Sequence, residues 1–466
     1  MSADERTTTR RWAEPLAFFL VAFLLRFAAA RLLAGEPVWD GHYYDFGARR
    51  IAEGHGYSDD RVVDGVTEWH PWCHYPVGYS AFLGFFYWVL GEKSWVAHLA
   101  NSLTGAAVVA VIYELARATF GVDLEGRVRT RMAAGIAMLH PGMVLYGALV
   151  MGEMLAALTV MGAFLVARRR GLWWGALVLG IGALVRPQAL LCAPFLAMAV
   201  PDRAEHVWRG RIVSAFLACV IALVPVLPWS ARNCAVMDGC ALVSTNAGWN
   251  LAIGSFPRAT GRFETLRSSD GCREVTGQVQ QDRCWLQYGK ANILANPSRW
   301  LGLMPAKLSF TFDHESFQVE YLREARPSAW PEDRRVFWRQ VMSTVHRLLV
   351  CALPLAFLAR SRSKVQIAAI VAALAAAYFG LSAGTPTVWP IVIAGCLLPL
   401  LPLPGRPPLE PALGFAVVLV ATTALTHAVF FGEDRYHVVA SPALALLAAA
   451  ALRKDQGRAG IFSSAT

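Results

Sequence analysis

The sequence predicts an all-α polytopic membrane protein with about 12 transmembrane helices (11–13). Of its 466 residues, 56% are hydrophobic and only 16% are charged, and the mean hydropathy is +0.41. The apolar residues occur in runs that are long enough to cross a hydrocarbon layer of ~30 Å as helices. These observations exclude a soluble globular protein.

The runs define the predicted spans. The first run follows a short polar arm and lacks a small-residue cleavage site, so we expect it to be retained as a span. Residues 76–91, "PVGYSAFLGFFYWVLG", would reverse the alternation of the spans if they crossed, and we interpret them as a re-entrant or interfacial helix. The predicted spans are 15–34, 95–116, 132–148, 151–167, 171–185, 187–200, 212–230, 341–359, 365–383, 387–403, 411–431 and 437–452.

The net charge of +10 invites a nucleic-acid interpretation, but the distribution of charge argues against it. With the amino terminus inside, the predicted cytoplasmic segments carry 20 Lys and Arg residues, and the outer connections other than loop 231–340 carry six. This is the bias of the positive-inside rule. We therefore expect a multi-pass inner (cytoplasmic) membrane protein with both termini cytoplasmic and no nucleic-acid partner.

The chain divides into two membrane blocks around one large outer loop. We see no internal repeat between the blocks, which counts against a transporter built from duplicated halves. The later part of the outer loop is expected to form amphipathic helices. The predicted domains are an N-terminal transmembrane module 1–230 with a catalytic first outer loop 35–94, an outer (periplasmic) loop domain 231–340, a C-terminal transmembrane module 341–453 and a cytoplasmic tail 454–466.

Five of the nine cysteines fall on the predicted outer side, where disulfides persist. Their spacing favours Cys234–Cys240 and Cys272–Cys284 and leaves Cys73 single. No CxxC pair or His/Cys array indicates structural zinc.

Polar residues gather at the predicted outer ends of the spans, while the span centres carry almost no charge. Charges at this depth are costly unless they pair or line a wet cavity, although a single one often only marks the interface. A translocation path needs polar groups through the bilayer, whereas a lipid-substrate enzyme needs them only near the headgroup. The set consists of Asp40 and Asp45 in the first outer loop, Glu153 between the third and fourth spans, Arg186 between the fifth and sixth, and Glu433, Asp434, Arg435, Tyr436 and His437 where the last span begins.

We therefore expect an active site on the periplasmic side, with Asp40 as the catalytic base and Glu153 as a second catalytic acid that orients the acceptor or binds an ion. Arg186 is expected to hold phosphate in a fork, with Arg435 as its helper. If 40–45 is helical, Asp45 lies on another side from Asp40 and has a supporting role. The predicted substrate-binding residues are Arg186, Arg435, Tyr436, Asp45, Tyr44, His74 and Asn246.

No cofactor is required by these residues, but a divalent metal ion stays open. The candidate ligands are Asp40, Glu153, His70 and His74. The HxxxH spacing in "EWHPWCHYP" has no fixed geometry in a loop, so ligation there is the weaker interpretation. His427, alone in an apolar span, is expected to be a packed core histidine.

Several stretches resemble the polytopic GT-C glycosyltransferases, in particular the bacterial relatives of protein O-mannosyltransferases and of the lipid A aminoarabinose transferase (glycosyltransferase 39/83-like). They are "YYDFGARRIAEGHGY", "YPVGYSAFLGFFYWVLG", "VAHLANSLTGAAVVAVIYELARATFG", "MGEML", "GALVRPQAL", "STNAGWNLAIGSFPRATG" and "EDRYHVVASP". The resemblance covers most of 15–320 and again about 425–452. Their order and spacing carry it, since no single motif is specific.

The resemblance implies an enzyme that transfers a sugar from a polyprenyl-phosphate donor to a lipid, glycan or protein hydroxyl by inverting displacement. The family's first-loop acid corresponds to Asp40, its second acid to Glu153 and its phosphate-holding base to Arg186. This chain departs from the aminoarabinose branch in having Arg rather than Lys there and in lacking a large soluble C-terminal domain. It also lacks the MIR modules of eukaryotic mannosyltransferases, so the acceptor stays open.

Two alternatives remain. A flippase or transporter of lipid-linked sugars would show paired charges at mid-span and repeat symmetry. An O-antigen polymerase or ligase would show catalytic arginines in the outer loops and no acidic first-loop motif. In every case the expected partners are membrane lipids and a lipid-linked sugar.

Overall fold

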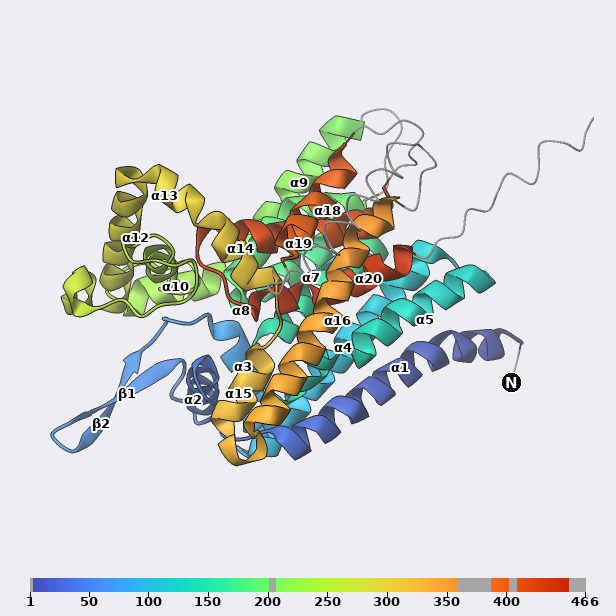
Figure 1. The fold of residues 1–466 in the computed structure, drawn as a ribbon. Helices are drawn as coiled ribbons and strands as arrows, with labels where there is room; N and C mark the ends of the chain where they lie inside the picture. Colours follow the sequence, from blue (N-terminus) through green and yellow to red (C-terminus); the bar gives the residue numbers. More distant parts are fainter. Residues whose placement is uncertain (1–2, 201–206, 359–386, 402–408, 452–466) are drawn as a thin grey trace, which may run out of the picture.

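The computed structural model describes residues 3–200, 207–358, 387–401 and 409–451. Long helices lie side by side, with the start of α1 at one end of the molecule (Figure 1). At the other end lie α10 (Leu227–Val236), α12 (Gln278–Ala295) and α13 (Pro297–Gly302). The helices of the apolar body are α1 (Ala3–Leu33), α4 (Ser94–Phe120), α5 (Leu124–Leu139), α6 (Pro141–Leu145), α7 (Glu153–Arg170), α8 (Leu172–Val185), α9 (Val207–Leu223), α16 (Glu332–Leu358), α18 (Trp389–Leu397), α19 (Pro411–Val429) and α20 (Ser441–Ala451), with short 3₁₀ helices η1 (Tyr146–Ala148), η2 (Pro187–Ala199), η6 (Leu398–Leu400) and η7 (Tyr436–Val439).

The apolar helices are those of a multi-pass membrane protein, and one continuous core joins them. Helix α1 packs on α4, α4 on α5 and α7, α7 on α8, and α16 on α20. Within the described residues, three helices are long and apolar enough to span a membrane, or up to five if each bent pair is one span. The predicted span 365–383 lies outside the described residues. The count of twelve therefore stays a prediction.

Proline residues lie at breaks in two predicted spans. The predicted span 132–148 is a helix only to Leu139, since Pro141 cannot continue the hydrogen-bond ladder. After this span the chain turns by 118° between Pro141–Ala148 and Glu153–Arg170. The predicted span 212–230 bends by 44° between α9 and α10 (Leu227–Val236), beside Pro225 and Pro228. The first bend places Glu153 at the start of α7.

The prediction of an all-α chain is wrong in one place. The first outer loop contains an antiparallel hairpin of β1 (Ser58–Val63) and β2 (Val66–Pro71), joined by Asp64-Gly65. Both turn residues have positive φ, 51° and 80°, as a type I′ hairpin turn requires. The Asp-Gly pair between valines is the sequence signal that predicts such a hairpin. The flanking helices are α2 (Asp40–Ala52) and α3 (Val77–Leu90).

The segment predicted as an outer-loop domain has its own small core. Its elements are α11 (Ala247–Ile253), η3 (Ser268–Asp270), η4 (Cys272–Glu274), α12 (Gln278–Ala295), α13 (Pro297–Gly302), α14 (Met304–Phe312), α15 (Phe317–Ala325) and η5 (Pro327–Ala329). Trp285 is fully buried in this core, which also takes Phe431 and Tyr436 from the segment after α19. The outer loop is thus packed onto the C-terminal module.

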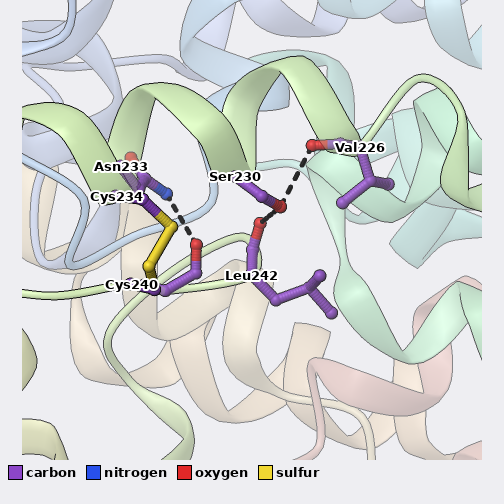
Figure 2. Close-up of a disulfide and its surroundings, with 7 residues drawn as sticks. Val226, Ser230, Asn233, Cys234, Cys240 and Leu242 are labelled. Atoms are coloured by element: carbon purple, nitrogen blue, oxygen red, sulfur yellow. Dashed lines mark hydrogen bonds between the residues drawn. A yellow bond between two sulfur atoms is a disulfide. The ribbon is translucent and has the colours of Figure 1, made fainter.

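Both predicted disulfides are present. Cys234–Cys240 joins the end of α10 to the irregular segment that follows, and Cys272–Cys284 joins η4 to α12. Beside the first, Ser230 donates a hydrogen bond of 2.6 Å to the Leu242 carbonyl and one of 3.2 Å to the Val226 carbonyl (Figure 2). Cys73 is single and buried, as predicted.

Candidate active site

A cavity of about 440 Å³ lies where the first outer loop, the α8–η2 turn, the 242–250 segment and the segment after α19 meet. Its volume is within the usual range for small-molecule sites, and its wall is mostly apolar with a few polar groups. The predicted site residues that line it are Asp40, Tyr44, His74, Arg186, Asn246, Arg435 and Tyr436.

Asp40 is the first residue of α2 and faces this cavity. One carboxylate oxygen accepts a hydrogen bond of 2.8 Å from the Tyr75 hydroxyl, and the other accepts one of 2.6 Å from Arg435. Burial disfavours the charged form, but attraction by Arg435 and the Tyr75 hydrogen bond outweigh it, so the pKa of Asp40 lies below its usual value. Asp40 is therefore an ionised carboxylate.

The backbone just before Asp40 is strained. Trp39 has φ of 52° and ψ of −131°, a conformation that costs a non-glycine residue about 1–3 kcal/mol and concentrates at functional sites. The Trp39 ring lies against Phe317 and Tyr321, with ring centroids 5.6 and 5.9 Å apart. Packing of Trp39 against α15 thus fixes the backbone that precedes Asp40.

Glu153 and Arg186 form a second buried ion pair. Glu153 is fully buried at the first position of α7, and one of its oxygens accepts a hydrogen bond from the Arg186 guanidinium. Arg186 lines the cavity, whereas Glu153 is not among the lining residues. Glu153 therefore lies behind Arg186 and positions it.

The two arginines converge on one tyrosine. The guanidinium carbons of Arg186 and Arg435 lie 5.4 and 5.0 Å from the centroid of the Tyr436 ring. Arg435 also donates a 3.2 Å hydrogen bond to the Tyr436 hydroxyl. His427 stacks on the same ring, with centroids 4.0 Å apart, and its Nδ1 bonds the Phe431 carbonyl, in keeping with the expected packed histidine.

Glu433 is a third acid at this cluster, and it lies 2.5 Å from Nε of Arg435. Burial raises the pKa of Glu433 to about 7, against the opposing pull of Arg435. The cluster then holds the guanidinium groups of Arg186 and Arg435, paired with the carboxylates of Glu153 and Asp40. It is neutral when Glu433 is protonated and carries one net negative charge when Glu433 is ionised.

The outer loop supplies the opposite wall of the cavity. Ser244 donates a 2.9 Å hydrogen bond to Asn246, and the Trp249 backbone amide donates one of 3.0 Å to Asp282. His74 lies between Tyr75 and Trp249, with ring centroids 5.0 and 6.2 Å away. Burial lowers the pKa of His74, which keeps the ring neutral.

Two predicted residues lie elsewhere. Asp45, five residues after Asp40 on α2, bonds the Tyr87 hydroxyl and pairs with Arg49 at 2.8 Å, so it holds α2 to α3 rather than lining the cavity. His70 is exposed on β2, 3.5 Å from Glu68. The structure does not bring His70 to the cavity with His74.

Sequence reasoning missed Tyr75 and the role of Glu433. Tyr75 stands among several aromatic residues of the first outer loop, any of which could be an interface aromatic, and no local pattern separates it from them. Glu433 is adjacent in sequence to a second acid, Asp434, which instead accepts hydrogen bonds from the backbone amides of Ser316 and Phe317.

Neither a protein-family model nor a curated protein matches the sequence. Solved structures with a similar backbone include the archaeal oligosaccharyltransferase AglB from Archaeoglobus fulgidus in complex with an inhibitory peptide and a dolichol-phosphate, with 12% identity and a TM-score of 0.45 over 95% of this chain and 50% of that one. The chain thus spans about half the length of that protein. ArnT from Cupriavidus metallidurans is similar in its undecaprenyl phosphate-bound form (13% identity, TM-score 0.38, 94% of this chain and 77% of that one) and in its apo state (15%, 0.36, 95% and 78%).

Proposed function

We propose that the chain is a membrane glycosyltransferase, which transfers a sugar from a polyprenyl-phosphate donor to a lipid, glycan or protein hydroxyl at the outer face of the membrane. The observation that carries the proposal is the convergence of Arg186 and Arg435 on Tyr436, beside the carboxylate of Asp40, in one cavity. The reaction needs cations for the leaving phosphate and a base for the attacking hydroxyl, and this cavity supplies both.

The arginines would bind the donor phosphate. Each guanidinium can offer a fork of parallel N–H groups, which matches phosphate oxygens better than a lysine does. Cationic stabilisation of the charge that develops on a leaving phosphate is commonly the largest catalytic contribution. Glu153 holds Arg186 from behind and keeps its guanidinium at the cavity wall.

Asp40 would act as the general base. The acceptor hydroxyl attacks the anomeric carbon, its proton passes to Asp40, and the bond from that carbon to the phosphate oxygen breaks with inversion. In the free site Arg435 lowers the pKa of Asp40. When the donor phosphate binds Arg435, Asp40 would lose this ion pair and its pKa would rise. Donor binding would thus make Asp40 a stronger base before the acceptor hydroxyl reacts.

The apolar rim of the cavity suits a polyprenyl chain. Leu191, Leu242 and Phe263 line the cavity and are 43%, 52% and 48% exposed. An isoprenoid tail buried on such side chains gains roughly 25 cal/mol for each Å² of apolar surface removed from water. The tail would thus leave the cavity along this rim while the phosphate stays at the arginines.

Asp40 and Glu153 were also candidate metal ligands. Both oxygens of Asp40 already accept hydrogen bonds, from Tyr75 and Arg435, and one oxygen of Glu153 accepts from Arg186. An ion at Asp40 would have to displace one of these donors. The proposed step therefore relies on the arginines for charge stabilisation.

The sidedness belongs to the proposal as well. Residues of the segment 242–250 line the cavity. The helices α10, α12 and α13, on either side of this segment in the sequence, lie at the end of the molecule opposite the start of α1 (Figure 1). With both termini cytoplasmic, as the charge bias predicts, the cavity opens to the periplasm, where the two disulfides are stable. A cysteine introduced at exposed Asp59 on β1 should react with a membrane-impermeant maleimide in intact spheroplasts. If this cysteine reacted only after lysis, the hairpin would lie on the cytoplasmic side, and the proposed orientation would be wrong.

The decisive experiment uses the purified full chain in detergent, without any gradient. Lipid-linked sugars extracted from the host membranes, with the sugar radiolabelled, serve as donor. We expect free polyprenyl phosphate to appear together with label on a hydroxyl acceptor. A flippase would leave the glycosidic bond intact, and a polymerase or ligase would consume only diphosphate-linked glycans; either result overturns the proposal.

A further inference from the structure

A second polar cluster lies in the interior, outside the cavity just described. Four buried side chains from four separate segments point at one place: His140 before α6, Glu315 between α14 and α15, His346 on α16 and His437 on η7. Oε2 of Glu315 lies 3.6 Å from Nε2 of His140, 3.9 Å from Nδ1 of His346 and 3.6 Å from Nε2 of His437. All four of these atoms are buried and lack a hydrogen-bond partner.

The tautomers of two histidines follow from their other ring nitrogens. Nε2 of His346 lies 2.9 Å from the Phe312 carbonyl, and Nδ1 of His437 lies 2.6 Å from the Thr311 carbonyl. A carbonyl oxygen only accepts, so each of these nitrogens carries a hydrogen. In the neutral rings that metal binding requires, the remaining nitrogens, Nδ1 of His346 and Nε2 of His437, present lone pairs to the Glu315 carboxylate.

Two lone pairs and a carboxylate that face one another in a dry interior repel unless a cation lies among them. A proton serves poorly, because N–H···O bonds need about 2.7–3.2 Å and the observed separations are 3.6 and 3.9 Å. A tetrahedral zinc ion with bonds of about 2.0–2.1 Å holds its ligand atoms about 3.3–3.5 Å apart. The separations from Glu315 to the two histidines exceed this spacing by about 0.1–0.6 Å. The His346 and His437 rings stack with centroids 3.7 Å apart, so a bound ion would draw the carboxylate inward and turn the two rings apart.

We propose that Glu315, His346 and His437 bind a divalent transition-metal ion, Zn²⁺ by preference, as a structural site. Among the described residues, these three form the group whose ligand atoms all lie within 4.8 Å of one another. Each imidazole donates its other N–H to a backbone carbonyl, which is the usual outer support of metal-bound histidine. Gln318 donates a 2.7 Å hydrogen bond to Oε1 of Glu315 and fixes the carboxylate.

His140 has a different role in this site. Its Nδ1 accepts a hydrogen bond of 3.4 Å from the Met143 amide, so its neutral ring carries hydrogen on Nε2, toward Glu315. At 3.6 Å this N–H is too far away to hydrogen-bond the carboxylate, so His140 only turns the positive end of its N–H dipole toward Glu315. The carboxylate is closely packed, since a Cβ on Gly142 would lie 1.6 Å from Oε1 of Glu315.

The site would fix the position of Arg435. His437 follows Arg435 by two residues, and Asp434 of the same segment accepts a 2.8 Å hydrogen bond from Ser316, next to Glu315. The segment 434–437 is thereby held to the segment 315–317 on both sides of Arg435. Metal binding does not depend on the proposed glycosyl transfer, so the two proposals can fail separately.

The test measures metal on the full chain, purified in detergent through a tag without histidine. Elemental mass spectrometry should find about one zinc ion per chain. After exchange of Zn²⁺ for Co²⁺, the protein should show the visible absorption bands of four-coordinate Co²⁺ bound to imidazole. His346→Gln and His437→Gln should lose the metal. Gln318→Leu should weaken its affinity by about 10–100-fold. His70→Gln, at an exposed hairpin position, is the matched control and should keep it.

If either ligand variant fails to fold, the wild-type chain still decides the question. A chelator should then lower its Tm, and added Zn²⁺ should restore it, since an ion bound only by the folded state stabilises that state. The proposal is overturned if the wild-type chain binds no metal, both as purified and after equilibration with Zn²⁺. Loss of metal in His70→Gln to the same extent as in the ligand variants would also overturn it.

Discussion

Arg435 and Asp40 are 395 residues apart in the chain, and they form a 2.6 Å ion pair at the cavity. The first outer loop and the segment before the last helix thus meet at one point. The pair joins the proposed base to one of the proposed phosphate ligands, so each should influence the other during turnover.

Asp40→Asn keeps the size and most hydrogen bonding of the side chain but removes its basicity. We expect turnover to fall at least about 10²-fold with little change in donor KM. The readout is release of polyprenyl phosphate by the purified variant. Asp59→Asn, an exposed change on β1, is the control. Retention of more than about a tenth of wild-type turnover would reduce Asp40 to a loop charge.

Arg186→Lys keeps the charge but not the fork, so donor KM should rise several-fold while Tm changes little. Arg186→Ala has a further consequence, because it leaves Glu153 buried without its partner. Breaking a buried pair in this way costs about 3–5 kcal/mol, so this variant should also lose Tm. The double variant Arg186→Ala, Glu153→Gln should regain Tm but not donor affinity. If the double variant regained both Tm and donor affinity, Arg186 would have only a structural role and would not bind the donor.

Glu433 predicts a pH dependence of donor binding. Its pKa of about 7 means that the cluster gains a negative charge as pH rises through 7. Donor KM should therefore increase, up to about tenfold, between about pH 6 and 8. Glu433→Gln stays neutral, so its KM should be nearly flat over this range. The assay is initial rate against donor concentration at each pH, and a wild-type slope equal to that of the variant would contradict the prediction.

The same carboxyl predicts the direction of a stability change. The unfolded chain releases the Glu433 proton near 4.5, and the folded chain keeps it to about 7. Between these values the folded state binds more protons, so this group lowers the free energy of unfolding as pH rises. Thermal melts in detergent should show a smaller loss of Tm from pH 5 to 7 in Glu433→Gln than in wild type. Parallel curves would refute the assignment.

The disulfide Cys234–Cys240 should support the cavity wall more than the whole fold. It closes a short loop of sequence separation 6, for which chain entropy predicts only about 2 kcal/mol. It also precedes Leu242 and Asn246, which line the cavity. Replacing both cysteines with serine should raise donor KM several-fold with a small loss of Tm. Cys219→Ser, outside the loop, is the control; equal effects on KM in both would contradict this role.

Much of the site could be predicted residue by residue. Asp40, Arg186 and Arg435 are conspicuous in the sequence because charge at the end of an apolar run is costly, and that cost is a local property. The disulfide pairs also follow from local spacing. The hairpin β1–β2 was missed although its signal, Asp64-Gly65 between valines, is equally local. That error is one of pattern recognition and not a limit of the sequence.

Which groups pair with which was decided by the tertiary structure alone. The sequence determined that carboxylates and arginines stand at the ends of apolar runs. Only the packing of helices joined Asp40 to Arg435 and Glu153 to Arg186, and turned Asp45 toward Tyr87. The same holds for His140, Glu315, His346 and His437, which share no motif. Pairing across hundreds of residues depends on distances of a few tenths of an ångström between packed helices, and no local pattern encodes those distances.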